Sequence, residues 1–186
     1  MTHRLTDLAS LSAGALHSAF DMVANEHTRV LVLGSLPGRQ SLEARRYYAN
    51  PRNQFWELMS PVAGVNLVPL DYAERLEALL TAGIGLWDVI ATARRKGSLD
   101  SAIQDASAND LNSAIASLPA LRAMAFNGGT AFRIGMQQLS PDAGIAAIPL
   151  PSSSSAYAVG IEAKRSAWRR LLSYRTIISG KSFDLP

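Results

Sequence analysis

Short apolar runs alternate with segments of helical length along most of this chain, and that alternation restricts its fold more than any other feature. The first run lies within Arg29–Gly34 and ends in glycine, which is typical of a strand buried on both faces of a parallel sheet. Three later runs resemble it, so strands are predicted over 29–34, 84–90, 122–126 and 143–150. The segments between and after them predict helices over 41–48, 54–62, 72–81, 109–117, 130–139 and 160–174. This order predicts an α/β protein whose parallel sheet is covered by helices on both faces.

Connections after the predicted strands carry most of the glycine and small polar residues. Right-handed crossovers bring such loops to one edge of a parallel sheet, and ligands of open α/β sheets bind outside the carboxyl ends of the strands. The loops expected to form a site there are 34–38, 88–97, 127–129 and 151–155.

The remaining segments have weaker patterns. Residues 1–17 predict a short helix or a loose tail, and the polar stretch 91–108 predicts a long loop with a short helix. With 186 residues and no internal repeat, the chain is predicted to form one domain over 28–186, preceded by an N-terminal extension over 1–27.

Composition excludes several kinds of chemistry. The chain has no cysteine, and its three histidines all precede the first predicted strand, so disulfides, thiolate zinc sites and cysteine-ligated clusters are excluded. We expect no metal and no cofactor, and any catalysis in the later loops must use Asn, Asp, Glu, Ser, Tyr or Arg. No apolar run is long enough to span a membrane and we identify no signal peptide, so a cytoplasmic location is expected.

Basic residues are mostly arginines, and they occur in clusters. The clusters are Arg39, Arg45–Arg46, Arg52, Arg94–Lys96, Lys164–Arg165 and Arg169–Arg170. Each cluster alone is explained by a solvated helix face. Several clusters beside predicted site loops favour a polyanionic partner, because guanidinium groups match phosphate oxygens.

The stretch Tyr47–Trp56 is the most unusual in the chain, with four aromatic residues, two asparagines and an arginine in ten positions. Aromatic rings can stack on an extruded base, and an amide can pair with its edge or hold a water molecule. A structural alternative places Phe55 and Trp56 in the core and makes Asn53 the N-cap of the following helix. For Asn53, capping and catalysis do not exclude each other.

Four further features remain open between structural and functional interpretations. Gly34–Gly38 either brings backbone close to a ligand or is a simple turn. Asn127 reads a nucleobase or forms a turn, and Pro151–Ser155 clamps a DNA backbone or is a flexible polar loop. Asp88 polarises a water, orients an arginine or bonds the next loop. Serine catalysis is disfavoured, because no histidine follows the serines and no nucleophile-elbow glycines flank them.

Taken together, Gly34–Gly38 and Tyr47–Trp56 resemble the first motif of the hypoxanthine (deoxyinosine) DNA glycosylases, a branch of the uracil-DNA glycosylase superfamily. Gly85–Val89, Phe126–Gly128 and Leu150–Tyr157 resemble the later motifs, in the right order. The resemblance runs from about residue 28 to residue 175 and includes Lys164 and Trp168 of the last helix. It implies a three-layer α/β/α sandwich with a four-stranded parallel sheet. It also implies hydrolysis of the bond between a damaged base and deoxyribose, without metal or lyase step.

The resemblance also implies roles for individual residues. Asn53 maps to the catalytic amide, which we expect to position a water molecule. The base pocket is expected to use Leu36, Tyr48, Phe55 and Asn127. DNA contacts are expected from Ser152, Ser153, Ser154, Arg52 and Lys164.

The sequence departs from the family pattern in the last motif and in residues 1–27, which have no counterpart in the family. Leu36 occupies a position where other branches carry Asn or Asp, and Ser155 replaces a usual proline, which predicts a less rigid loop and affects DNA affinity rather than chemistry.

The expected function is therefore monofunctional excision of deaminated bases, most of all hypoxanthine, from DNA by a monomeric enzyme that flips the base out of the helix. Three alternatives remain: a uracil-selective glycosylase on the same fold, a non-catalytic nucleic-acid binder, and a phosphate-binding α/β hydrolase that uses the Gly34–Gly38 loop and a divalent metal.

Overall fold

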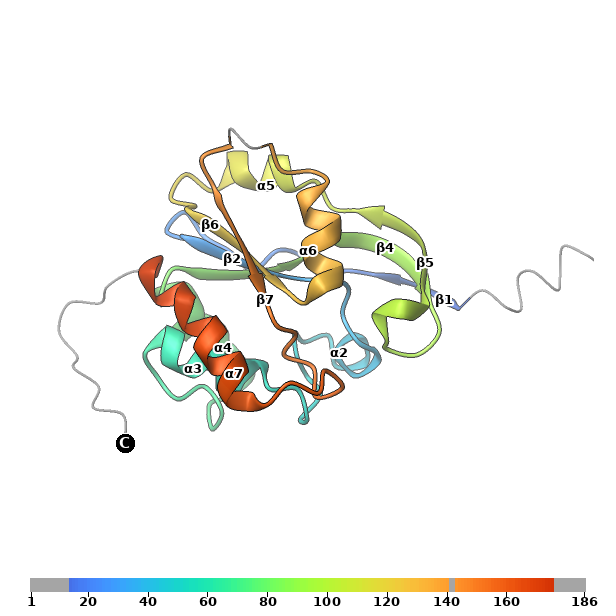
Figure 1. The fold of residues 1–186 in the computed structure, drawn as a ribbon, viewed down its shortest axis with the longest axis horizontal. Coiled ribbons are helices and arrows are strands. Elements are labelled where there is room, and N and C mark those ends of the chain that lie inside the picture. Colours follow the sequence, from blue (N-terminus) through green and yellow to red (C-terminus); the bar gives the residue numbers. More distant parts are fainter. Residues whose placement is uncertain (1–13, 141–142, 176–186) are drawn as a thin grey trace, which may run out of the picture.

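A four-stranded parallel sheet forms the centre of the computed structural model, which describes residues 14–140 and 143–175 (Figure 1). The strands stand in the order β3 (Ile84–Asp88), β2 (Val30–Gly34), β6 (Ala123–Asn127) and β7 (Ala146–Leu150). Their register pairs Gly34 with Asp88, and Asn127 with Leu150. The carboxyl ends of all four strands therefore lie at one edge, as predicted.

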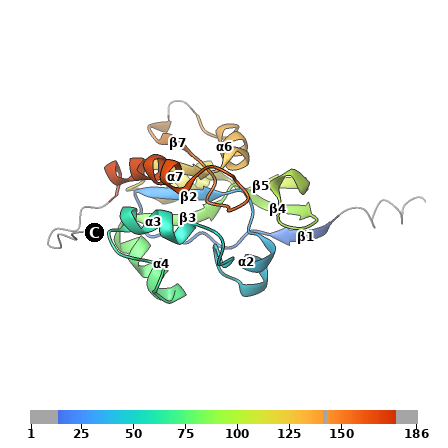
Figure 2. The ribbon, with the colours of Figure 1, turned by 60° about the horizontal axis from the view of Figure 1, so that its bottom comes forward.

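Helices cover both faces of this sheet, because the alternating side chains of β2 enter two separate cores. Val30 and Val32 pack with α3 (Phe55–Ala63), α4 (Tyr72–Thr81) and α7 (Ile161–Trp168). Leu31 and Leu33 pack on the opposite face with α5 (Leu111–Ser117) and α6 (Gly129–Met136). Figure 2 shows α4 and α6 on opposite sides of the strands. The predicted α/β/α sandwich is confirmed.

Local signals explain where several helices begin and end. Asp71 caps α4 through a capping box, in which its side chain accepts from the Glu74 N–H and the Glu74 carboxylate accepts from the Asp71 N–H. Asp110 caps α5 through the Ser113 N–H. Helix α2 (Arg39–Ala44) is shorter than predicted, because Arg45 adopts a left-handed conformation with φ of 51°. The last predicted helix divides into α7 and the 3-10 helix η3 (Arg169–Ser173).

A second sheet corrects two predictions. Strands β1 (Ala15–Ser18), β4 (Ile90–Arg95) and β5 (Ile103–Ala108) form an antiparallel sheet in the order β1-β4-β5. The helix or loose tail expected over 1–17 is therefore wrong for residues 15–17, and the long loop expected over 91–108 is a hairpin. A loop was predicted over 91–108 because β5 is an exposed edge strand whose composition is polar, like that of a loop. The short helix expected within that stretch is present as the 3-10 helix η1 (Asp100–Ala102).

The N-terminal segment also contacts the main sheet, since Val23 forms an antiparallel bridge with Leu86. The domain boundary at residue 27 stays a prediction, and residues 1–13 lie outside the described part. Within the described part of the chain, none of the helices has the length and apolarity required to cross a membrane.

Gly135 allows the ring of Phe126 to pack against α6, and Phe126 directly precedes Asn127. A Cβ at Gly135 would overlap the Phe126 ring, whereas a Cβ at Gly129 in the same helix would meet nothing within 4 Å. We predict that Gly135→Ala lowers the free energy of unfolding by about 1–3 kcal/mol through overpacking. The control Gly129→Ala should leave it unchanged or raise it by up to about 1 kcal/mol. Urea denaturation measures both, and equal midpoints for the two variants would contradict the packing argument.

Candidate active site

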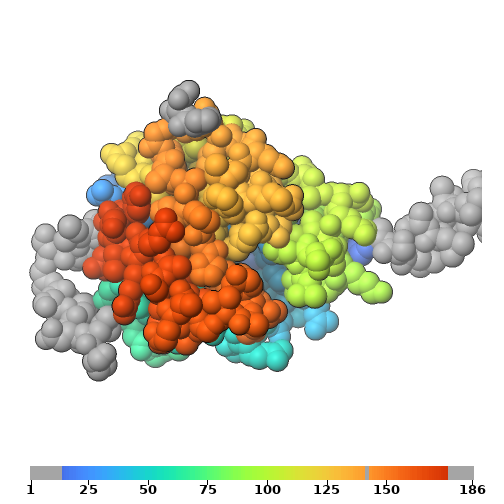
Figure 3. Space-filling view, in the orientation of Figure 1, coloured from blue at the N-terminus to red at the C-terminus, as the bar shows by residue number. Residues whose placement is uncertain are grey.

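A cleft of about 650 Å³ opens at the carboxyl edge of the parallel sheet. The loops after β2, β6 and β7 line it, together with Asp88 at the end of β3, the segment between α2 and α3, and the tip of the β4–β5 hairpin. In Figure 3 the green hairpin and the orange segment near residue 150 stand apart, with blue residues of the earlier chain recessed between them. Every loop predicted to carry the site thus contributes to a single cleft.

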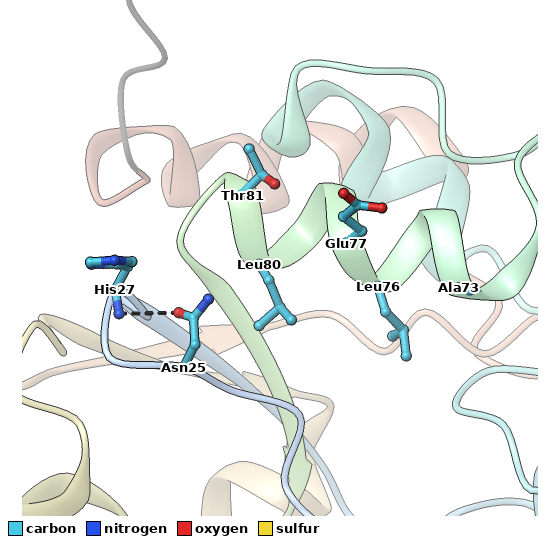
Figure 4. A pocket seen from close by; sticks show the side chains of 7 residues that line it. All are labelled: Asn25, His27, Ala73, Leu76, Glu77, Leu80 and Thr81. Carbon is cyan, nitrogen blue, oxygen red and sulfur yellow. Dashed lines mark hydrogen bonds between the residues drawn. The ribbon is translucent and has the colours of Figure 1, made fainter.

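A second hollow, of about 770 Å³, lies away from this edge beside α4. Leu76 and Leu80 project into it, and the Asn25 side chain accepts from the His27 N–H and from the Thr28 hydroxyl within its own turn (Figure 4). Its lining is mainly apolar and brings no set of catalytic groups together. The carboxyl-edge cleft is therefore the candidate active site.

Tyr48 forms an aromatic wall of the cleft. Its ring stacks on Phe55 with a centroid separation of 3.6 Å and an interplanar angle of 6°, and Phe55 is fully buried behind it. The backbone of Tyr48 takes a left-handed conformation, with φ of 53°, which is unusual for a large side chain. Of the two predicted base-pocket aromatics, Tyr48 lines the cleft, while Phe55 supports it and does not line the cleft.

Asn127 links this wall to the loop over residues 151–155, the serine loop. Its Nδ2 donates to the Tyr48 hydroxyl at 3.1 Å and to Ser153 Oγ at 2.8 Å, and its Oδ1 accepts from the Ser153 N–H at 2.8 Å. Because a backbone N–H can only donate, the Ser153 bond fixes which atom of the amide is the oxygen. Both hydrogens of Nδ2 are then used, and Oδ1 keeps one lone pair for a ligand.

Asn53 enters the cleft from the start of α3. Its Oδ1 accepts from the Phe55 N–H at 3.0 Å, and the next residue, Gln54, donates its N–H to the Ser153 carbonyl at 3.0 Å. The predicted N-cap role of Asn53 is wrong, because Gln54 is the N-cap of α3 and Asn53 lies one residue before it, where its Oδ1 reaches the first N–H of the helix. Its amide NH₂ bonds to no group in the described residues and is available to a ligand or water.

Lys164 holds the serine loop from below. Its ammonium is 1% exposed and donates to Gln54 Oε1 at 2.8 Å and to the Ser154 carbonyl at 3.0 Å. Trp168 also donates to the Pro151 carbonyl at 3.0 Å. Sequence patterns grouped Lys164 with the DNA-contacting residues, and the structure places its charge beneath the loop and outside the lining of the cleft.

The three serines of this loop have distinct positions. Ser153 is buried with Asn127, whereas Ser152 and Ser154 accept from the N–H groups of Ser154 and Ala156, each at 3.2 Å. These turns shape the loop around Ser155, where a proline was expected.

Arg95 was not identified from the sequence as a residue of the site, yet it holds the loop Gly34–Gly38, the first glycine loop, in place. Its guanidinium is buried and donates to the Leu36 carbonyl at 3.3 Å and to the Pro37 carbonyl. Further along the hairpin, Asp100 accepts from the Ser35 hydroxyl at 2.6 Å. Nothing in the run Arg94–Lys96 distinguishes one buried arginine from its exposed neighbours, so no local signal could have found it. The predicted residue Leu36 lines the cleft on this loop.

Of the arginine clusters, Arg39 and Arg52 line the cleft and are exposed. Arg39 also forms an exposed ion pair with Glu43 at 3.7 Å. Outside the cleft, Arg94 pairs with Asp105, and Arg165 pairs with Glu57 and Glu162. A polyanion bound in the cleft would contact Arg39 and Arg52.

Asp88 closes the floor of the cleft at the end of β3. It is 3% exposed, and its Oδ2 has no hydrogen-bond partner among the described residues. Burial raises the pKa of Asp88 to about 7, although the neighbouring Tyr47 hydroxyl and the Arg95 guanidinium act in the opposite direction. Searching the described residues finds no group of three or more histidine, cysteine, aspartate or glutamate side chains able to hold a metal ion.

Comparison with known proteins agrees with this geometry. The family model of the uracil DNA glycosylase superfamily matches residues 20–172. A hypoxanthine DNA glycosylase of Methanosarcina acetivorans is 37% identical over 155 residues, covering 83% of this chain and 97% of its own. One of Methanosarcina barkeri is 35% identical over 149 residues, covering 80% and 93%. The chain therefore belongs to the uracil-DNA glycosylase superfamily.

A solved structure extends the similarity to three dimensions. The solution NMR structure of a candidate uracil DNA glycosylase from Methanosarcina acetivorans superposes with a TM-score of 0.77 at 35% identity. The match covers 86% of this chain and 99% of the other. The branch inferred from Tyr47–Trp56 is thus the one to which the two curated relatives belong by name.

Protonation of Asp88 should be visible in the stability of the protein. An unfolded aspartate titrates near pH 4, and the folded Asp88 titrates near pH 7, so the charged form is penalised only in the folded state. The contribution of Asp88 to the free energy of unfolding is fully present below about pH 4 and is lost as the pH rises to about 7. We predict that the wild type loses stability relative to Asp88→Asn by up to about 1.4 kcal/mol per pH unit in that range, and no further above it. Denaturation of both proteins from pH 5 to pH 9 measures this, and a constant difference would contradict the shift.

Proposed function

We propose that this protein is a monofunctional DNA glycosylase that extrudes a deaminated base, hypoxanthine above all, and hydrolyses its N-glycosidic bond. The observation that carries the proposal is the joining of three groups in one cleft: the Tyr48 wall, the Asn127 amide held in one orientation, and the Asn53 amide with a free NH₂. The names of the two curated relatives support it. The protein acts as a monomer on DNA in the cytoplasm and needs no metal.

The orientation of Asn127 supports selection of deaminated bases. Hypoxanthine carries an N1–H donor, whereas adenine has a lone pair at the same ring position. Because the Nδ2 hydrogens of Asn127 are engaged by Tyr48 and Ser153, the amide offers a ligand only the free lone pair of Oδ1. An acceptor facing N1 bonds hypoxanthine and repels adenine, and leaving it unpaired would cost about 1–3 kcal/mol. Uracil and xanthine carry equivalent N–H groups, as do guanine and thymine, so the same contact admits them and discriminates only against adenine and cytosine.

Tyr48 and Leu36 then form the walls of the base pocket. A base stacked on an aromatic face gains about 1–3 kcal/mol, which offsets part of the few kcal/mol that extrusion costs. The stacked pair of Tyr48 and Phe55 keeps this wall rigid before DNA arrives.

Asn53 is placed to hold the attacking water. Its side chain is fixed by the Phe55 N–H through Oδ1, so its NH₂ direction is set by the start of α3. An amide orients water but is a poor base, so the rate must come mainly from stabilising the departing base and the cationic sugar.

The DNA backbone would pass over the serine loop and the two exposed arginines of the cleft. Ser152 and Ser154, with the exposed Arg52 and Arg39, offer hydroxyl and guanidinium donors to phosphates. Lys164 acts through Gln54 and Ser154, holding the loop in the shape that meets the phosphate.

Base release should depend on Asn53. We predict alkali-sensitive strand cleavage after incubation in chelator with duplexes carrying deoxyinosine, deoxyuridine or deoxyxanthosine, strongest for deoxyinosine. Asn53→Ala should lower single-turnover release by at least about 100-fold, since one positioned group contributes that much. Asn66→Ala is the matched control, because Asn66 Oδ1 makes the same kind of turn bond, to the Val68 N–H at 3.2 Å, outside the cleft.

Each outcome of that assay is decisive. Release mainly from deoxyuridine would assign the protein to the uracil-selective alternative. DNA binding without release from any duplex would support the non-catalytic alternative, and activity abolished by chelator would support the metal-dependent hydrolase.

Arg52 and Lys164 should differ in their effect on DNA binding. Measured in the Asn53→Ala background, Arg52→Ala should reduce the slope of log affinity against log salt by about 1, because one phosphate contact is lost. Lys164→Met should keep the wild-type slope and instead lower the free energy of unfolding by about 1–3 kcal/mol, because two charge-assisted bonds disappear. A reduced salt slope for Lys164→Met would show that its ammonium contacts phosphate directly.

A further inference from the structure

Asp88 stands on the floor of the cleft, directly beside Gly34. The two residues are paired in register at the ends of β3 and β2. A Cβ placed at Gly34 would lie 2.6 Å from Asp88 Oδ1 and 3.5 Å from the Tyr48 hydroxyl. Because glycine has no Cβ, the Asp88 carboxyl packs directly against Gly34, close to the hydroxyl end of the aromatic wall.

Apart from the neighbouring Tyr47 hydroxyl, no side chain of the described residues bonds the buried Asp88 carboxyl. Asp88 Oδ2 is buried without a partner, and the nearby Arg95 directs its Nη groups to the Leu36 and Pro37 carbonyls instead. The main-chain carbonyl of Asp88, by contrast, accepts from Asn109 Nδ2 at 2.9 Å and anchors the strand end. The side chain is thus dispensable for holding β3 in place.

The groups facing Asp88 come from every element around it. They are the Tyr47 and Tyr48 hydroxyls, the Arg95 guanidinium on β4 and the Asp100 carboxylate on η1. Burial outweighs them, and the pKa of about 7 leaves a large neutral fraction at neutral pH. Burial and the charge of Asp88 raise the pKa of Tyr48 above its usual range, so its hydroxyl keeps its proton.

A group that can donate a proton favours the excision of a purine. The departing base takes the electron pair of the broken bond, and protonation of a ring nitrogen lowers that cost. The amides of Asn53 and Asn127 cannot give up a proton. Among the described residues that line the cleft, the carboxyl groups are Asp88 and Asp100, and Asp100 is already bonded to Ser35.

We propose that Asp88 is the general acid of the reaction, donating a proton to a ring nitrogen of the leaving purine. This inference rests on the proposed function. As the bond between N9 and C1′ breaks, its electron pair passes to the base, and the Asp88 carboxyl proton moves to N7 or N3. The water held at Asn53 adds its oxygen to C1′, and its released proton restores the acid through the solvent of the cleft. The sum is one water consumed, one neutral base and one abasic sugar formed.

Single-turnover release of hypoxanthine from pH 5.5 to pH 9 tests the proposal. The wild-type rate should be constant at low pH and fall tenfold per unit above about pH 7. Asp88→Asn, which retains shape and hydrogen bonding but has no acidic proton, should be about 100-fold slower at pH 6 and insensitive to pH. Asp100→Asn should move the wild-type midpoint to lower pH, because the Asp100 charge helps to raise the pKa of Asp88.

Substrate analogues separate proton donation from a structural effect. Duplexes carrying 7-deaza- or 3-deaza-deoxyinosine lack one or the other accepting nitrogen. On the analogue that lacks the nitrogen protonated by Asp88, wild type and Asp88→Asn should release the base at rates within about threefold. Thermal denaturation of each variant at pH 6 confirms that it is folded.

Different failures have different meanings. A wild-type profile that stays flat through pH 7, or an equal loss in Asp88→Asn on all three substrates, would overturn the role of Asp88 while leaving the proposed function standing. A wild type that releases no hypoxanthine at any pH would overturn the proposed function and this inference together.

Discussion

Parallel pairing of β2 with β3 and β6 is the constraint on which the site depends. Register places Gly34 beside Asp88 and Leu33 beside Phe126, so a glycine, a carboxyl group and the Asn127 amide stand in neighbouring strands at one edge. None of these groups is close to another in sequence. Because β2 is buried on both faces, a shift of one residue would exchange its two cores and displace all three groups at once.

Around that edge the cleft is assembled by hydrogen bonds that cross between loops. Asn127 joins the aromatic wall to the serine loop, and Arg95 joins the hairpin to the first glycine loop. Each of these bonds pairs polar groups that are buried, and leaving such groups unpaired would cost free energy. The loops therefore hold one another in shape without a ligand, as expected of a site that must bind a base rapidly after extrusion.

Much of this arrangement could be predicted from the sequence because its signals are local. The apolar runs identified the four parallel strands, the capping residues placed α4 and α5, and the density of aromatic and amide residues in Tyr47–Trp56 marked the site. Hairpin β4–β5 could not be predicted, because an exposed edge strand and a loop have the same polar composition. The burial of Arg95 and Lys164 depends on segments that are distant in sequence, so their charges looked like surface charges. The fold and the lining of the cleft could thus largely be predicted from the sequence, whereas the buried residues that hold the lining in place, Arg95 and Lys164, could not.

The link from Lys164 to Gln54 joins residues 110 positions apart, and Arg165 reaches Glu57 across a similar interval of 108. Contacts of such high sequence separation form late, because the entropy of closing a long loop must be overcome first. During synthesis the segment that carries Asn53 leaves the ribosome well before Lys164, so the emerging chain holds this segment without the support of α7. The serine loop gains its shape only when that helix docks. We therefore expect a chain that lacks this helix to hold the loop without the Lys164 contacts to Gln54 and Ser154.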